Sequence, residues 1–96
     1  MRRYYIYIMS NQPNGTLYIG VTSNLIKRVY EHKYASLDSF TKKYGLKRLV
    51  YYEECSDVGS AIQREKNLKT WKRDWKIKLI EHGNPSWNDL WNEISH

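Results

Sequence analysis

The stretch that decides the fold is Tyr4-Tyr5-Ile6-Tyr7-Ile8-Met9, followed by Leu17-Tyr18-Ile19-Gly20-Val21. Both runs are rich in β-branched and aromatic residues, as strands are, and the segment Asn11-Gln12-Pro13-Asn14-Gly15 between them has the composition of a turn. We therefore expect a β-hairpin. If Tyr7 pairs with Tyr18, the aliphatic side chains share one face of the hairpin and the tyrosines share the other.

The remaining elements follow from periodicity and from helix-stop residues. A third strand is expected over residues 47–54, and residues 38–44 suit a short helix or an irregular link that Gly45 ends. Helices are expected over residues 24–34, from about residue 57 to residue 70, and over residues 73–82. The sheet is therefore expected to have three strands.

Short polar side chains mark where these helices begin. Thr22 or Ser23 offers an N-cap for the first helix, and Ser56 or Asp57 offers one for the helix that ends near residue 70. The run Ser86-Trp87-Asn88-Asp89 resembles a capping box that opens a short last helix and docks Trp87, Leu90 and Trp91.

The totals limit what the chain can be. Ninety-six residues suffice for one modest core, so we expect a single domain over residues 1–96. Cys55 stands alone, which excludes an internal disulfide and a cysteine-based zinc site. Residues 4–9 are too short and too rich in tyrosine for a signal peptide, and no apolar run is long enough to span a membrane. A cytoplasmic protein is expected.

The charge favours a polyanionic partner. Sixteen Lys and Arg against ten Asp and Glu give a formal net charge of +6. The plainer alternative is a merely soluble basic protein.

Glu65 is the most informative single residue, because a carboxylate stands on a helix stripe expected to face inward. That stripe comprises Val58, Ala61, Ile62, Glu65 and Leu68. The structural alternative is that Glu65 pairs with a nearby Lys or Arg or reaches the edge of the helix. The functional alternative is a ligand for Mg²⁺, which prefers oxygen ligands and often needs only one or two protein carboxylates.

Two tyrosines and a glycine are expected on the polar face of the hairpin. Taken alone, Tyr7 and Tyr18 are ordinary strand residues. Together with Gly20 they predict a shallow platform, where a phosphate approaches the backbone without meeting a Cβ atom. On the helix that follows, Arg28 and His32 are one turn apart and both could point at this platform. Arginine suits phosphate binding, and histidine donates a hydrogen bond or moves a proton near neutral pH.

Basic residues interleaved with aromatic residues suit contacts with nucleic acid. Trp71, Trp75 and Leu79 fall at helical spacing, so we assign these side chains to the core and only basic residues to DNA. The residues expected to contact nucleic acid are Gly20, Lys42, Lys43, Lys47, Arg64 and Lys69.

The order Tyr5-Ile6-Tyr7, Tyr18-Ile19-Gly20, Arg28, His32 and a helix-borne Glu65 resembles the GIY-YIG nuclease family, and specifically its small single-domain bacterial branch. Tyr5 stands where the family name has glycine. The resemblance implies an α+β fold, with a three-stranded, mostly antiparallel sheet flanked by helices and an active site on the exposed sheet face. Asn84 corresponds only loosely to an asparagine of the family and also suits a helix stop.

The resemblance implies a metal-dependent endonuclease that hydrolyses phosphodiester bonds in DNA, with a role in DNA repair or recombination. Tyr7, Tyr18, Arg28 and His32 correspond to the catalytic residues, and Glu65 to the ligand of one Mg²⁺ or Mn²⁺ ion. One of the two tyrosines, with its pKa lowered by the metal and the neighbouring cation, would deprotonate the attacking water. Arg28 would stabilise the charge on the phosphate, and His32 would orient the phosphate or relay a proton.

Two other functions remain open at this point. The first is a non-catalytic nucleic-acid-binding module on the same scaffold, and the second is a protein-interaction domain whose aromatic face meets an acidic protein. DNA is the expected partner in the first function, as in the nuclease, with no membrane involved. A protein partner that supplies targeting would suit a chain without a DNA-recognition module.

Overall fold

The sheet of this protein has three antiparallel strands. The computed structural model describes residues 3–35 and 39–95. Its strands are β1 (Tyr4–Ser10), β2 (Leu17–Thr22) and β3 (Arg48–Cys55), in the order β2-β1-β3, and both pairings are antiparallel. The predicted α+β class with an antiparallel sheet is confirmed, and each predicted strand end is within one residue of the observed one.

The register of the hairpin differs from the expected one by two residues. Tyr7 lies opposite Gly20, and Tyr18 lies opposite Met9. The predicted pairing of Tyr7 with Tyr18 is therefore wrong. Because side chains alternate between the faces of a strand, a shift of two residues leaves every side chain on its predicted face.

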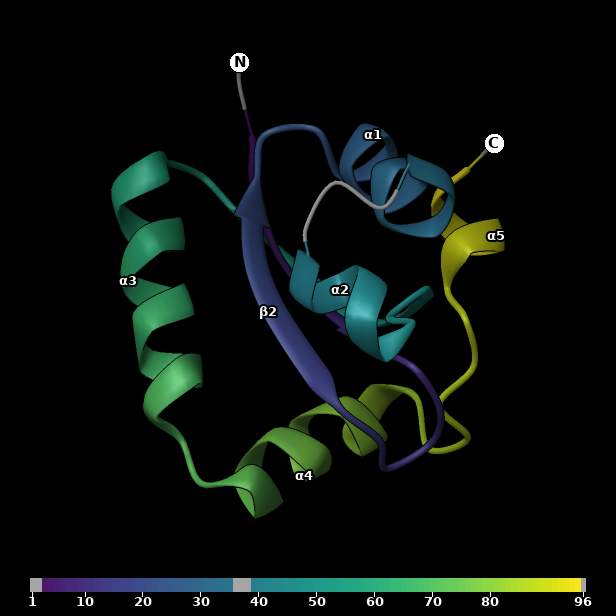
Figure 1. The fold of residues 1–96 in the computed structure, drawn as a ribbon. Helices are drawn as coiled ribbons and strands as arrows, with labels where there is room; N and C mark the ends of the chain where they lie inside the picture. The colour runs from purple at the N-terminus through teal and green to yellow at the C-terminus, as the bar shows by residue number, and fades with distance from the viewer. Residues whose placement is uncertain (1–2, 36–38, 96) are drawn as a thin grey trace.

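Helices cover both faces of the sheet. In Figure 1, β2 lies between α3 on one side and α2 on the other, while α4 crosses below the sheet and α5 lies near the C-terminus. Asp38, where the second helix was expected to begin, lies outside the described residues. The helical elements are α1 (Leu25–Tyr30), the π-helical segment η1 (Glu31–Ala35), α2 (Ser39–Tyr44), α3 (Val58–Thr70), α4 (Arg73–Gly83) and α5 (Trp91–Ile94).

The predicted N-cap residue is confirmed for α3 but not for α1. Asp57 caps α3, and its side chain accepts a hydrogen bond from the backbone N–H of Ser60. The cap of α1 is Asn24, whose Oδ1 accepts from the N–H of Lys27, so the prediction of Thr22 or Ser23 is wrong. The Thr22 hydroxyl donates a hydrogen bond to the backbone carbonyl of Asn24 and accepts one from its N–H.

The last helix begins later than expected. Helix α5 starts at Trp91, and its N-cap residue Leu90 makes no side-chain cap bond, so the predicted capping box is wrong. Asp89 instead accepts hydrogen bonds from the backbone N–H groups of Leu49 and Trp91, which ties this segment to β3. The docking of Trp87 is confirmed, since only 2% of its surface is exposed.

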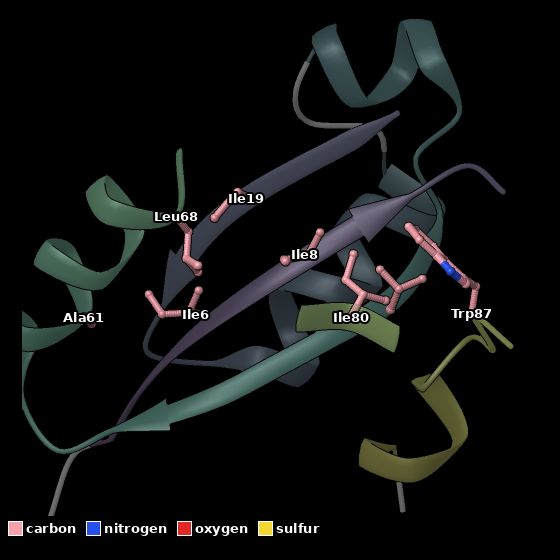
Figure 2. Close-up of a cluster of buried hydrophobic side chains, with 8 residues drawn as sticks. Ile6, Ile8, Ile19, Ala61, Leu68, Ile80 and Trp87 are labelled. Atoms are coloured by element: carbon pink, nitrogen blue, oxygen red, sulfur yellow. The ribbon is translucent and has the colours of Figure 1, made fainter. Parts of the chain in front are cut away.

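The aliphatic face of the sheet packs against α3 and α4. Figure 2 shows Ile6, Ile8 and Ile19 of the strands on the same side as the side chains from the helices. These buried residues form one apolar cluster, which contains Ile6, Ile8, Ile19, Val50, Ala61, Leu68, Ile80 and Trp87. Burial of this cluster from water holds α3 and α4 against the sheet.

The tyrosine face of the sheet is also covered, by residues from α1, the segment after α2, and the C-terminal region. Leu25, Val29 and Leu46 pack there against Tyr7 and Met9. Because no part of Tyr7 is exposed, the expectation of an open platform on an exposed sheet face is wrong. The tyrosine face carries enough apolar surface to form a second core.

Some side chains expected in the core are exposed. Val58 and Ile62 of α3 are 47% and 41% exposed, because α3 turns only a narrow stripe containing Ala61 and Leu68 towards the sheet. Trp75 is 51% exposed, because the chain becomes extended at Trp71 and the helical spacing does not continue across this corner. Within the described residues, none of the helices is both long enough and apolar enough to cross a bilayer.

Candidate active site

The β-hairpin brings Tyr7 and Gly20 into direct opposition. A Cβ atom on Gly20 would lie 2.5 Å from both the Cζ and the Oη atoms of Tyr7. The Tyr7 ring therefore lies across the glycine of the edge strand and fills the clearance that was expected for a phosphate. Gly20 is required here because any side chain would collide with the phenol.

Helix α1 and the π-helical segment bring His32 to the same phenol. The Oη of Tyr7 and the Nε2 of His32 are 2.9 Å apart in a buried hydrogen bond. The ring of Tyr18 lies against both, with centroids 6.3 Å from Tyr7 and 5.3 Å from His32. Two tyrosines and a histidine that are distant in sequence thus form one aromatic cluster, as the nuclease hypothesis requires.

Arg28 is the exposed member of this group. Its side chain is 44% exposed, and its Nε lies 3.5 Å from a carboxylate oxygen of Glu31. Both its charge and its hydrogen bonding lower the pKa of Tyr7, so the guanidinium faces the phenol. A guanidinium with exposed surface beside the buried cluster is available to a phosphate.

Glu65 approaches the cluster from α3. Its carboxylate charge raises the pKa of Tyr7, and its ion-pair partner Lys69 lines a groove together with Tyr18. The Nζ of Lys69 is 3.4 Å from its Oε2, and the Glu65 side chain is 22% exposed. The ion pair expected from the structural alternative is present, and it lies beside the tyrosine cluster.

The electrostatics of Tyr7 differ from the expected ones. Burial, followed by the neighbouring Tyr18, raises the pKa of Tyr7 well above its usual value; Arg28 lowers it and Glu65 raises it. The lowered pKa predicted for one of the two tyrosines depends on a bound metal ion, and it stays a prediction; of the two neighbours expected to act on Tyr7, Arg28 lowers its pKa as predicted. At neutral pH Tyr7 is a protonated phenol that can donate to the imidazole of His32.

The donor atoms present fit a hard cation with few protein ligands. Within residues 3–35 and 39–95, no three His, Cys, Asp or Glu side chains gather where they could share a metal ion. Glu65 is a partly exposed carboxylate that forms an ion pair with one exposed lysine, Lys69. Mg²⁺ and Mn²⁺ accept such a site when water and substrate phosphate supply the other ligands.

The comparison with known families agrees with this geometry. The model of the GIY-YIG catalytic domain matches residues 3–78, which include every residue of the cluster. This chain belongs to the GIY-YIG family. The nucleases of this family act on DNA.

Relatives of this chain include UPF0213 proteins, whose names state no activity. A UPF0213 protein of Staphylococcus saprophyticus is 35% identical over 83 residues, covering 86% of this chain and 100% of the relative. A UPF0213 protein of Clostridium perfringens is 34% identical over 76 residues, covering 79% and 81% of the two chains. The solution structure of a UPF0213 protein from Bacillus halodurans matches with a TM-score of 0.57 at 22% identity, covering 97% of each chain, which shows the fold alone.

The basic residues predicted to contact DNA are found in different settings. Lys42 and Lys43 are exposed on α2, and Lys47 is exposed in front of β3. Arg64 is engaged within the protein, because its Nε donates to Glu53 at 2.8 Å and its guanidinium lies over the ring of Trp71. Whether these basic residues contact DNA stays a prediction.

Two further residues lie beside the cluster, although the sequence did not place them at the candidate site. Phe40 lies with its ring centroid 6.3 Å from that of Tyr18, and Lys76 of α4 lines the same groove as Lys69. Phe40 and Lys76 each look like an ordinary surface or core residue in the sequence. Only the packing of α2 and α4 on either side of β2 brings them to Tyr18.

Proposed function

We propose that this protein is a divalent-cation-dependent endonuclease that hydrolyses phosphodiester bonds in DNA. One observation carries the proposal: the phenol of Tyr7 is hydrogen-bonded to the imidazole of His32, and the charges of the Arg28 guanidinium and of the Glu65 carboxylate both act on its pKa. Acid-base groups, a phosphate-binding cation and a metal-binding carboxylate are the parts needed for phosphodiester hydrolysis.

Tyr7 and His32 form the proposed proton relay. The attacking water gives a proton to the Oη of Tyr7 while Tyr7 gives its own proton to the Nε2 of His32, 2.9 Å away. A relay of this kind needs no preformed phenolate, which suits a Tyr7 whose pKa is raised by burial. Histidine is a suitable final acceptor because its side chain exchanges protons near neutral pH.

Arg28 and Glu65 act on the phosphate. Arg28 stabilises the negative charge that develops on the non-bridging oxygens while the bond from phosphorus to the 3′ oxygen breaks. A Mg²⁺ or Mn²⁺ ion held by Glu65 would supply Lewis-acid stabilisation of the leaving 3′ oxygen. Because Tyr7 is wholly buried, the side chains packed over it must shift before a substrate reaches the phenol.

The test is a cleavage screen with a matched control. Purified protein is incubated with duplex, branched and single-stranded DNA in Mg²⁺, in Mn²⁺ or in EDTA, and products are separated by gel electrophoresis. We expect cleavage with either ion and none in EDTA. Glu65→Gln should lower the cleavage rate by about a hundredfold or more, whereas Glu54→Gln, which removes the same charge beside Arg3, should leave it unchanged.

The relay has its own expected result. His32→Gln should lower the cleavage rate by roughly 10²–10⁴-fold while DNA affinity stays close to that of the wild type, because a general acid-base group acts on the reaction more than on binding. A wild-type protein that binds DNA but cuts none of these substrates would favour the non-catalytic binding module. A role in DNA repair or recombination, and a partner that supplies targeting, stay predictions.

A further inference from the structure

A groove lies beside the proposed active site, along the edge strand β2. It has a volume of about 290 Å³, and its walls come from α2 on one side and from α3 and α4 on the other. Figure 1 shows β2 between these helices. No carboxylate is among the described residues that line it, and these residues are Leu17, Tyr18, Ile19, Phe40, Lys69 and Lys76.

The chemistry of this groove suits a phosphate carried on an apolar or aromatic group. Lys69 and Lys76 supply two ammonium groups, and the Nζ of Lys76 donates to the backbone carbonyl of Lys69 at 3.4 Å, which brings the two residues together. Phe40, 42% exposed, and Tyr18 supply the aromatic surface. One nucleotide of a DNA strand has both of these parts.

Lys69 belongs to two sites at once. It lines the groove, and its Nζ lies 3.4 Å from the carboxylate of Glu65, one helical turn away. Its side chain is 54% exposed, so this ion pair is a weak surface pair that is easily exchanged. An ammonium and a divalent cation cannot both occupy the same carboxylate oxygens without repelling each other.

We propose that Lys69 is a positioning residue that exchanges partners. In the cation-free protein it pairs with Glu65; when a divalent cation takes that carboxylate, Lys69 turns into the groove and, with Lys76, binds the DNA phosphate next to the one that is cut. This inference rests on the proposed function, because it takes Glu65 as the metal ligand. It adds a second phosphate site and a link between the two binding events.

The exchange makes the binding of metal and of DNA mutually favourable. The cation releases Lys69 for the phosphate, and the phosphate draws Lys69 away from the carboxylate that the cation needs. Thermodynamic linkage then requires DNA to tighten metal binding by the same factor by which the metal tightens DNA binding. Without the Lys69 ammonium, this factor becomes smaller.

The experiment measures Mn²⁺ affinity from the electron paramagnetic resonance signal of free Mn²⁺. It uses the full chain, with and without an oligonucleotide whose linkages are all phosphorothioates. The variants are Lys69→Gln and, as matched control, Lys66→Gln, which removes the same charge from an exposed neighbour on α3. Without DNA, Lys69→Gln should bind Mn²⁺ roughly three- to tenfold more tightly than the wild type, and Lys66→Gln should stay close to the wild type.

The second measurement is the effect of DNA on Mn²⁺ affinity. The oligonucleotide should tighten Mn²⁺ binding several-fold in the wild type and clearly less in Lys69→Gln. A gain in metal affinity cannot come from a damaged fold, so it separates the exchange from a merely structural role of Lys69.

A failure of the Lys69 exchange can be distinguished from a failure of the proposed metal site. If Lys69→Gln and Lys66→Gln change Mn²⁺ affinity equally while Glu65→Gln abolishes Mn²⁺ binding, the exchange is overturned and the proposed metal site stands. If Glu65→Gln leaves Mn²⁺ binding unchanged, the metal site of the proposed function is wrong and the exchange is overturned with it.

Discussion

Tyr7 and Gly20 form a cross-strand pair in which the ring of one residue takes the place of the side chain of the other. The phenol lies 2.5 Å from where a Cβ atom of residue 20 would be, and it also makes the buried hydrogen bond to His32. A small change at residue 20 therefore reaches the proposed proton relay directly.

We expect Gly20→Ala to lower the free energy of unfolding by about 1–3 kcal/mol, because the added methyl group displaces a buried ring. The displaced phenol should also lose its bond to His32, so the cleavage rate should fall. Urea denaturation and the cleavage assay measure the two effects. The control is Gly83→Ala, where a Cβ atom meets no other atom within 4 Å, and a comparable loss of stability there would contradict the explanation.

Tyr52 and Glu93 form a second pair that can be tested by pH. The Tyr52 hydroxyl donates to a carboxylate oxygen of Glu93 at 2.6 Å, and this bond to the carboxylate raises the pKa of Tyr52 to about 12. The unfolded chain, with a tyrosine pKa near 10, then loses its proton before the native protein does. The stabilisation by this pair is therefore complete below pH 10 and is lost as the pH rises towards about 12.

Tyr52→Phe tests this expectation. Near pH 8 the variant should be less stable than the wild type by about 1 kcal/mol, because it lacks the hydrogen bond. Above pH 10 the difference should shrink, because only the wild type has the phenol that ionises. Urea denaturation at a series of pH values measures the difference, and a constant difference from pH 8 to beyond pH 11 would refute the assignment.

At the scale of elements, the helix after the hairpin decides where Arg28 and His32 lie. Asn24 caps α1, which carries Arg28, and the chain then continues as the π-helical segment that carries His32. π-Helical turns are rare and are frequent at functional sites, where they change the direction of a side chain. The cap and the π-helical turn together set the approach of both residues to Tyr7.

Asn24→Ala should therefore lower the free energy of unfolding by about 1 kcal/mol, because the N–H of Lys27 loses its side-chain acceptor. The measurement is urea denaturation followed by circular dichroism. Asn92→Ala, at an exposed position in α5, is the control and should change stability by much less. Equal effects of the two substitutions would mean that the cap contributes nothing particular to α1.

Helix α3 combines a packing role with a chemical one. Ala61 and Leu68 are wholly buried against the sheet, and Glu65 lies between them on the same stripe. The two apolar contacts fix the helix, so α3 carries the carboxylate along the edge strand β2. Val58 and Ile62, which were expected to share this work, are exposed.

At the scale of the whole molecule, the net charge of +6 favours a polyanionic partner, which is DNA in the proposed function. Each lysine that neutralises a phosphate releases counterions, so the logarithm of the affinity falls linearly with the logarithm of the salt concentration. Lys42 and Lys47 are exposed and are expected to make such contacts.

Lys42→Gln and Lys47→Gln should each reduce this salt slope by about 1. Fluorescence anisotropy with a labelled DNA duplex at several KCl concentrations measures it. Arg3→Gln is the control, because Arg3 is already paired with Glu54. An unchanged slope in both lysine variants would remove these residues from the DNA-binding surface.

Local rules in the sequence were enough for much of the fold. The alternation of side chains assigned the residues of the hairpin to the correct faces, although the predicted register was wrong by two residues. A shift by an even number of residues does not move a side chain to the other face. Helical spacing placed Glu65 on an inward stripe. The resemblance then indicated that Tyr7, Tyr18, Arg28, His32 and Glu65 belong together.

The environment of Tyr7 and the groove beside β2 depend on which elements pack against one another, so only the tertiary structure decided them. The amino-acid sequence by itself determined the three strands and the main helices, because these follow from neighbours along the chain, and its resemblance to the GIY-YIG family indicated the candidate site residues. The burial of Tyr7, its raised pKa, its bond to His32 and the groove that joins Phe40 to Lys76 arise from contacts between distant segments. Desolvation and close approach exist only once those segments have packed.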